Sequence, residues 1–391
     1  MSEMSYLEKL LDGVDVEWLP LSDLARIRNG KDHKSLSEGE FPVYGSGGIM
    51  RYVDTYAYNK PSVLIPRKGS LGNLFFVDVP FWTVDTIFYT EIDEAQIRPK
   101  YLYYFLTTVG LGEMNQAGGV PSQTQSVLNK LKIPIPCPGN PEKSLAIQSV
   151  IVRILDKFSA LTAELTAELT MRKKQYNYYR DQLFSFGAHD VKRLKLGELC
   201  VIGDGLHGTP EYDANGDYFF INGNNLGYQK ISFNDNTKKV NDPMFKKHGI
   251  HFDPINTVFL SINGTIGNVS FYNNEKIVLG KSVAYFKIKS PELHTRYLFY
   301  FLQTNYAKQY FENQKTGSTI KNLGLKSLRA FEIPIPSYDE QLYIVATMDK
   351  FYNLTNSITE GLPREIELRQ KQYEYYRDLL FSFPKPETVS N

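Results

Sequence analysis

Several features that would assign this chain to a common class are scarce or missing. It has only two cysteines, Cys137 and Cys200, which excludes a disulfide scaffold and leads us to expect a reducing compartment, the cytoplasm. No stretch approaches the ~18 consecutive apolar residues that a membrane-spanning helix needs. The N-terminal segment MSEMSYLEKLLDG has acids where a signal peptide has lysines, so we expect neither signal nor anchor. The net charge of +1 gives no argument for a nucleic-acid partner.

Motifs for catalysis and cofactor binding are missing as well. The segment GDGLHG at 203–208 has the glycine spacing of a dinucleotide loop, but Thr-Pro follows where a helix N-terminus is needed. GKS at 280–282 lacks the upstream glycine of a phosphate-binding loop, and the chain contains no Pro-Pro pair of an amino-methyltransferase motif. His248 and His251 lack a third metal ligand. We therefore expect a chain without catalytic residues, cofactor or metal.

The sequence does contain an internal duplication. RKKQYNYYRDQLFSF at 172–186 returns as RQKQYEYYRDLLFSF at 369–383, with 12 of 15 positions identical. Four shorter matches occur in the same order in both halves, at offsets between about 193 and 200. They are VLIPRKGSLGN and VFLSINGTIGN (63–73, 258–268), YLYYFL and YLFYFL (101–106, 297–302), LKIPIP and FEIPIP (131–136, 331–336), and LDKF and MDKF (155–158, 348–351). Ordered matches of this kind indicate a tandem duplication.

Both halves are built in the same way. Each opens with 120 to 145 residues rich in glycine, asparagine, aromatic and β-branched residues, in short apolar runs that turn residues interrupt. This composition predicts β-strands. A short aromatic helix is expected next, and an Ile-Pro-Ile-Pro segment then keeps the backbone extended. A long helical pattern closes each half, from about 143 to 185 and from about 338 to 381.

The long helical patterns carry apolar stripes with steps of three and four, as Leu155, Phe158 and Leu165 illustrate. Two such helices of near-equal length would bury their stripes against each other, and antiparallel pairing would hold two globular heads apart at opposite ends. The predicted fold class is therefore α+β, with two β-rich globular domains, two long antiparallel coiled-coil helices and an internal pseudo-twofold repeat. Pro363 should kink or restart the second helix.

At this point the pattern resembles the specificity subunits of type I restriction–modification systems. The resemblance covers nearly the whole chain and rests on the IPIP segments, the QY-x-YYRD-x-LFSF helix ends and the pair Glu340-Gln341. The first helix departs from the pattern, since it keeps Gln148 but not the preceding glutamate. The resemblance implies target-recognition domains at 1–141 and 188–337 and conserved helices at 142–187 and 338–391, the latter with a tail.

The resemblance also implies a function. Each target-recognition domain would read one half of a bipartite, asymmetric site in double-stranded DNA. The helices would set the spacer and dock two methyltransferase subunits, with restriction subunits as further partners and no membrane. The chain itself would be non-catalytic.

Candidate site residues follow from this interpretation. Arginine and lysine bind guanine and phosphate, and glutamine binds adenine, although an ordinary solvated side chain is the alternative for each residue. The DNA-binding candidates are Lys31, Lys34, Arg51, Arg67, Lys68 and Gln123 in the first domain, and His207, Lys230, Lys281, Lys315, Ser318 and Lys321 in the second. The partner-binding candidates are Tyr176, Tyr179, Arg180, Tyr373, Tyr376 and Arg377. The spacer candidates belong to a tandem Thr-Ala-Glu-Leu repeat and are Thr162, Leu165, Thr166 and Leu169.

Two other classes of function remain open from the sequence. A coiled-coil scaffold protein could present two ligand-binding domains, and a standalone nuclease would cut DNA with a metal. Sequence-specific, salt-sensitive DNA binding would distinguish the specificity subunit from the scaffold. Metal-dependent cleavage by the pure chain would indicate the nuclease.

Overall fold

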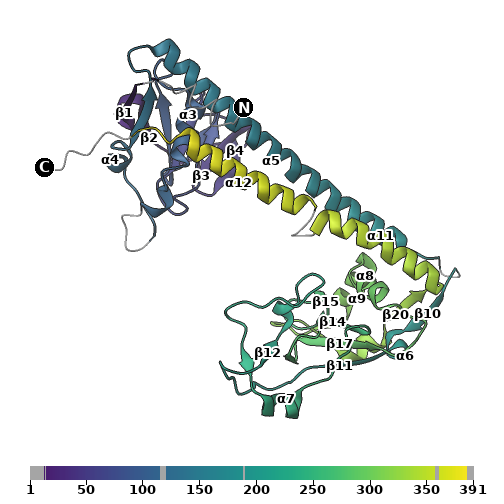
Figure 1. Cartoon of the computed structure of the whole chain (residues 1–391). Helices are drawn as coiled ribbons and strands as arrows, with labels where there is room; N and C mark the ends of the chain where they lie inside the picture. Colours follow the sequence, from purple (N-terminus) through teal and green to yellow (C-terminus); the bar gives the residue numbers. More distant parts are fainter. Residues whose placement is uncertain (1–12, 14, 115–119, 188–189, 357–360, 385–391) are drawn as a thin grey trace. The chain divides into compact units, whose positions relative to one another are not determined.

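The computed structural model describes residue 13 and residues 15–114, 120–187, 190–356 and 361–384. The N-terminal segment in which no signal was expected lies, except for Gly13, outside the described residues. The chain divides into two compact units, which we describe separately (Figure 1). Unit 1 comprises residues 1–166 and 365–391, and unit 2 comprises residues 167–364. Each unit therefore combines residues from both halves of the duplication.

Unit 1 contains the first β-rich head, here called head 1. A two-stranded antiparallel ribbon joins its entry and exit, β1 (Val16–Pro20) and β9 (Lys132–Pro136). A four-stranded sheet has the order β2 (Ala25–Asn29), β8 (Ile87–Ile92), β5 (Ser62–Pro66), β6 (Phe75–Val77). A three-stranded sheet has the order β4 (Gly48–Val53), β3 (Phe41–Gly45), β7 (Trp82–Thr83). The helical elements are α2 (Leu21–Leu24), α3 (Pro99–Leu106), η1 (Leu111–Glu113) and α4 (Gln125–Leu128).

Unit 2 contains head 2, whose entry and exit strands β10 (Lys192–Lys195) and β20 (Glu332–Ile335) pair in the same way. Its four-stranded sheet has the order β11 (Cys200–Asp204), β17 (Val283–Ile288), β14 (Thr257–Ser261), β15 (Val269–Phe271). Its three-stranded sheet has the order β13 (Lys239–Val240), β12 (Tyr218–Ile221), β16 (Ile277–Leu279). A hairpin of β18 (Lys315–Thr316) and β19 (Asn322–Leu323) is added. The helical elements are α6 (Leu196–Leu199), η2 (Gly223–Asn225), α7 (Asp242–His248), α8 (Thr295–Phe301), α9 (Asn305–Gln314) and α10 (Leu325–Ala330).

The two heads share one topology. In both, the first strand of the four-stranded sheet pairs with the last, and the middle pairing joins β5 to β8 in head 1 and β14 to β17 in head 2. In both three-stranded sheets one pairing is parallel and the other antiparallel. The repeat and the α+β class predicted from the sequence are therefore confirmed.

The long helical segments differ between the two halves. The first is one helix of 43 residues, α5 (Pro141–Leu183). The second consists of α11 (Tyr338–Asn356) and α12 (Leu362–Leu380). Gly361 has a positive φ of 80°, which favours glycine, and Pro363 lies in the first turn of α12, where its missing N–H costs no helical bond. The restart predicted from Pro363 is therefore confirmed.

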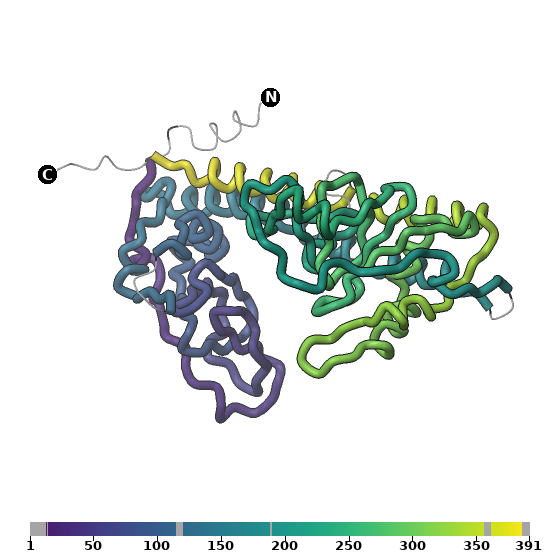
Figure 2. Tube along the Cα trace, turned by 90° about the horizontal axis from the view of Figure 1, so that it is seen from below, coloured from purple at the N-terminus to yellow at the C-terminus, as the bar shows by residue number. Residues whose placement is uncertain are grey.

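Within each unit the long helices pair in antiparallel orientation. In unit 1, α5 begins and α12 ends beside head 1, and both views show α12 running along the first part of α5 (Figure 1, Figure 2). The rings of Phe158 and Tyr376 stack there with centroids 5.2 Å apart. In unit 2, α11 begins and α5 ends beside head 2, and Phe351 stacks on Tyr179 at 5.4 Å. The predicted antiparallel pairing is confirmed within each unit.

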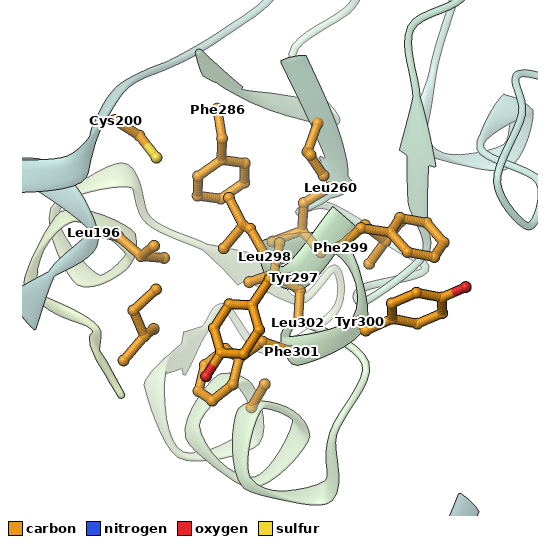
Figure 3. Close-up of a cluster of buried hydrophobic side chains, with 14 of the residues drawn as sticks. Leu196, Cys200, Leu260, Phe286, Tyr297, Leu298, Phe299, Tyr300, Phe301 and Leu302 are labelled. Atoms are coloured by element: carbon orange, nitrogen blue, oxygen red, sulfur yellow. The ribbon is translucent and has the colours of Figure 1, made fainter. Parts of the chain in front are cut away.

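The short aromatic helix of each unit, α3 or α8, lies in that unit's core with nearly all of its side chains buried. Figure 3 shows the cluster around α8 in unit 2. In unit 2, Phe184 at the end of α5 packs on Tyr297 and Phe301 of α8, with centroid distances of 4.9 and 5.9 Å. In unit 1, Phe381 packs on the equivalent rings of α3 at 5.2 and 5.6 Å. Among the described residues, no helix combines the length and apolarity needed to cross a bilayer.

Candidate nucleic-acid interface

In head 1 the loop after β5 lies against the chain that precedes α4. The Gly69 amide donates to the Pro121 carbonyl at 2.8 Å, and the Gln123 amide donates to the Arg67 carbonyl at 3.0 Å. A β-bridge between Lys68 and Ser122 completes the pairing. Gln123 is thereby brought beside Arg67 and Lys68, two other predicted DNA-binding residues, although it lies more than fifty residues from them in the sequence.

These three side chains differ in their environment. Lys68 forms a 3.6 Å ion pair with Asp85, and both side chains are largely exposed, so solvent screens the pair and Lys68 stays available to a phosphate. The Arg67 guanidinium lies 5.8 Å from the centre of the Phe88 ring. Gln123 is only 2% exposed, and its Nε2 donates to the Pro66 carbonyl at 2.5 Å. Gln123 therefore braces the loop in this conformation, and its contact with DNA stays a prediction.

Head 2 repeats this pairing at the equivalent positions. The Leu323 amide donates to the Ile262 carbonyl at 2.8 Å, and the Gly264 amide donates to the Lys321 carbonyl at 3.1 Å. Three further candidates, Lys315, Ser318 and Lys321, belong to the β18–β19 hairpin that forms one side of this pairing. Lys315 pairs with Glu312 of α9, while the ammonium of Lys321 donates to the Gly317 carbonyl at 2.9 Å. We call the paired loops of each head the loop junction: 67–73 with 121–123, and 262–268 with 315–323.

A second contact between loops occurs after the first strand of each four-stranded sheet, β2 in head 1 and β11 in head 2. In head 1 the Lys31 amide donates to the Thr83 carbonyl at 2.7 Å, which places the loop that carries Lys31 and Lys34 beside β7. In head 2 the Lys281 amide donates to the Leu206 carbonyl at 2.9 Å, so that Lys281 lies beside the loop of His207. The bond in head 2 that is equivalent to the one from Lys31 is donated by the Leu206 amide to the Leu279 carbonyl at 2.8 Å.

The remaining candidates lie on separate elements of the heads. His207 contacts Asp204 at 2.8 Å and its side chain is 73% exposed. Arg51 on β4 donates to the Leu36 carbonyl at 3.1 Å. Lys230 is exposed in a turn that the bridge between Leu226 and Ile231 closes. Direct contacts of these residues with DNA stay predictions.

Each head is fastened to its long helix by a buried glutamine near the helix start. The Gln148 side chain accepts from the Arg98 amide at 2.8 Å and donates to the Gln96 carbonyl at 3.1 Å. Gln341 accepts from the His294 amide at 2.9 Å and donates to the Glu292 carbonyl at 2.7 Å. Both side chains are fully buried. The sequence showed these glutamines only as part of a family pattern, and their repetition was the signal for a structural role.

A carboxylate about two turns further along the helix provides a second fastening. Asp156 accepts from the Tyr104 hydroxyl at 2.6 Å and pairs with Lys100 at 2.8 Å. Asp349 makes the same contacts with the Tyr300 hydroxyl and with Arg296. Burial, and then the hydrogen bond to the carboxylate, raise the pKa of each tyrosine far above its usual range. Both hydroxyls therefore remain protonated donors.

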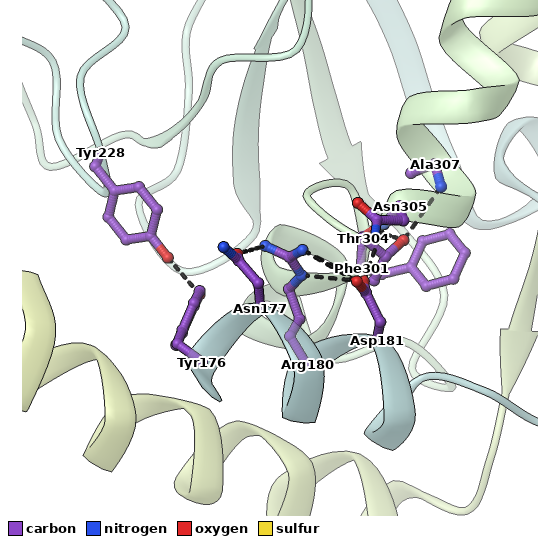
Figure 4. A network of polar contacts seen from close by, with 9 residues as sticks. All are labelled: Tyr176, Asn177, Arg180, Asp181, Tyr228, Phe301, Thr304, Asn305 and Ala307. Atoms are coloured by element: carbon purple, nitrogen blue, oxygen red, sulfur yellow. Dashed lines mark hydrogen bonds and ion pairs between the residues drawn. The ribbon is translucent and has the colours of Figure 1, made fainter. Parts of the chain in front are cut away.

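Two partner-binding candidates lie inside unit 2 (Figure 4). Tyr176 is buried and shares a hydrogen bond with the Tyr228 hydroxyl. Arg180 is 3% exposed, donates to Asn177 at 3.0 Å and pairs with Asp181 at 3.3 Å. The Tyr176 hydroxyl thus joins the end of α5 to head 2, whereas Arg180 bonds to neighbours on α5 itself.

The other partner-binding candidates are also engaged within their own units. Tyr179 and Tyr376 use ring faces in the stacks described above, and Arg377 lies over the ring of Tyr373 and pairs with Asp378. Tyr178 and Tyr375, by contrast, are each 61% exposed. The clustered tyrosines therefore do not all face the helix seam: of the candidates Tyr179 is 45% exposed, and the two most exposed members, Tyr178 and Tyr375, are ones that the candidate set omitted.

The spacer candidates all lie within α5. The hydroxyl of Thr162 donates to the Phe158 carbonyl at 3.0 Å, and that of Thr166 donates to the Thr162 carbonyl at 2.7 Å. Leu165 and Leu169 are both half-buried. The two Thr-Ala-Glu-Leu copies thus occupy successive, equivalent turns of one helix.

The model of the type I restriction modification DNA specificity domain matches this chain twice, over residues 13–171 and 189–368. The type I restriction enzyme EcoR124I/EcoR124II specificity subunit of Escherichia coli is 40% identical over 423 residues, covering 100% of both chains. A putative type I restriction enzyme specificity subunit of Haemophilus influenzae is 32% identical and covers 97% of this chain and 98% of its own.

Solved structures are similar to this chain in fold. The type I restriction–modification S subunit from M. genitalium has a TM-score of 0.53 at 16% identity and covers 96% of this chain and 98% of its own. A chain from a study of complex assembly and conformational transition of the type I system has a TM-score of 0.64 at 15% identity, with coverages of 94% and 97%. At these identities the likeness shows the shared architecture alone.

Proposed function

The chain belongs to the family of type I restriction–modification specificity subunits, and we propose that each of its heads reads one half of a bipartite, asymmetric site in double-stranded DNA. Specificity subunits recognise DNA within a type I complex, and the family is in general non-catalytic. The observation that carries the proposal is the repeated loop junction. The same backbone pairing presents different side chains in the two heads, as two readers of unlike sequences require.

The loop junctions, together with the loops that follow β2 and β11, are the proposed DNA-contacting surfaces. Lys68 in head 1 and Lys321 in head 2 are the proposed phosphate contacts, since both side chains are exposed. Solvent screens the ion pair of Lys68 with Asp85, and Lys321 donates to a backbone carbonyl, so that both ammonium groups stay available to a phosphate. The other candidates in these loops would position the DNA or contact base edges.

The long helices are the proposed spacer and docking elements. Each unit contains one start and one end of the long helical segments, so that equivalent surfaces occur twice. Two equivalent surfaces would dock two methyltransferase subunits, and restriction subunits would join through them. Methylation and cleavage would then come from the partners, and the complex would act in the cytoplasm.

The test replaces Lys68 and Lys321 separately with glutamine and measures DNA binding by the assembled complex across a salt series. Each substitution should weaken binding to all sequences similarly and reduce the slope of log affinity against log salt by about one, because one phosphate contact is lost. Lys132, exposed at the start of β9 and paired with Pro20 instead of with a junction loop, supplies the control K132Q. Unchanged slopes for both lysine variants, or an equal loss for K132Q, would contradict the assignment of these surfaces.

A further inference from the structure

Unit 2 contains a cavity of about 730 Å³ between the end of α5 and the loops of head 2. Three cationic side chains line it, Lys173 and Arg180 from α5 and Lys308 from α9. Amide side chains and aromatic rings, including Asn177 and Tyr228, also line it, together with aliphatic side chains such as Ile266. The volume is in the range of small-molecule sites.

The charges around this cavity do not cancel. Glu312 also lines it but is paired with Lys315, and Asp181 is paired with Arg180 and accepts from the Asn305 amide at 2.9 Å. Lys173 and Lys308 are therefore left in excess. Burial, and then the neighbouring guanidinium of Arg180, lower the pKa of Lys308, as expected for a cation held near another cation. An anion in the cavity would relieve this repulsion.

The two tyrosines in the wall add no negative charge. Burial raises the pKa of Tyr176 and, more strongly, that of Tyr228, so that their shared hydrogen bond joins two neutral hydroxyls (Figure 4). The ring of Tyr228 also stacks on Tyr352 at 4.8 Å, which fixes this wall in place. The cavity is thus a preformed basic site with a rigid side.

The duplication itself provides an internal comparison. The repeated helix end differs at three of its 15 positions, and two of these differences line the cavity. Lys173 and Asn177 of α5 correspond to Gln370 and Glu374 of α12, and each exchange makes the unit 2 site more positive by one charge. In unit 1 the Gln370 amide donates to the Glu374 carboxylate at 2.9 Å instead. Positive charge is therefore a property of this corner in unit 2 and not of the shared helix pattern.

We propose that this cavity binds a phosphate group, supplied either by the DNA backbone or by a free nucleotide or polyphosphate. The rim favours DNA as the source, because Gly267 and Asn268 line the cavity and belong to the loop that pairs with Lys321 at the head 2 loop junction. Gly267 has a φ of 102° and open space where a side chain would stand, so that a phosphate can approach its backbone closely. The DNA source rests on the function proposed above, whereas the phosphate site does not.

The experiment titrates inorganic pyrophosphate into the full-length chain by calorimetry and compares two double variants. K173Q/N177E installs the residues that the same helix pattern carries in unit 1, so that folding should be retained. K174Q/K371Q removes the same amount of charge from exposed positions outside the cavity lining. We expect saturable binding at one site, weakened about tenfold or more by K173Q/N177E and nearly unchanged by K174Q/K371Q.

The single variant K308Q is the second measurement and should also weaken pyrophosphate binding. Displacement of pyrophosphate by a duplex without the recognition site would identify the DNA backbone as the source, and simultaneous binding would identify a free phosphate compound. The proposal is overturned if the wild-type chain shows no saturable binding, if K173Q/N177E and K308Q bind as the wild type does, or if both double variants lose affinity equally. Loss of sequence-specific DNA binding is measured separately and would count only against the function proposed above.

Discussion

Deleting one Thr-Ala-Glu-Leu copy, residues 162–165, is the most direct perturbation of the proposed spacer. In the shortened helix Thr166 would take the place of Thr162 and donate to the Phe158 carbonyl, as Thr162 does in the present structure. Leu169 would take the half-buried place of Leu165. The local contacts are thus reproduced, and the change should act on length and rotation rather than on stability.

The geometry of the helix determines how much the DNA spacer should change. The 43 residues of α5 span about 65 Å, and four residues account for about 6 Å and about 400° of rotation, a residual of roughly 40°. One base pair of DNA rises about 3.4 Å and turns about 35°. The rotation corresponds to one base pair, whereas the rise lies between one and two. We expect the spacer to shorten by one base pair, because a groove that faces the wrong way costs more than a small axial strain.

The assay maps methylated sites across the genome of a host that carries either the wild-type chain or the deletion. Both half-site sequences should stay the same while the distance between them changes. Deleting only residues 162–163 is the control, since about 200° of rotation turns the apolar stripe away from its partner and should abolish assembly. An unchanged spacer in the four-residue deletion, or altered bases within either half-site, would refute the reasoning.

Three further predictions concern individual residues. Gln148→Ala and Gln341→Ala each leave buried backbone partners unsatisfied and should lower the free energy of unfolding by about 1–3 kcal/mol, measured by denaturant titration; losses within error would contradict the fastening role. Tyr178→Ser and Tyr375→Ser, at exposed positions, should change stability little, and each should remove one of two methyltransferase subunits in native mass spectrometry, whereas retention of both excludes these docking surfaces. Burial raises the pKa of the Cys200 thiol to about 12, so at pH 8 it should resist alkylation until the chain unfolds, and rapid labelling of native protein would disprove its burial.

Much of the architecture follows from the sequence by itself. The duplication predicts two alike heads because the same pattern of apolar residues and turns selects the same strand pairings. The helix restart follows from Pro363, since a proline cannot supply the N–H of a helix interior. Antiparallel pairing follows from two apolar stripes of equal length that must be buried in one chain. These are properties of local backbone chemistry and of periodicity, both of which are visible in a string of residues.

Only the tertiary structure decided where individual side chains lie. Gln123 has a side chain of the kind that contacts adenine, yet its backbone pairs with Arg67 and its side-chain amide donates to the Pro66 carbonyl. Tyr176 and Tyr178 belong to one cluster, but packing against head 2 buries the first and leaves the second exposed. Contacts between segments far apart in the sequence determine such orientations, and neither spacing nor composition records which segments meet. The basic cavity of unit 2 arises in the same way, because α9 and a loop of head 2 bring Lys308 and Gly267 to a helix end that the sequence shows only as a repeat.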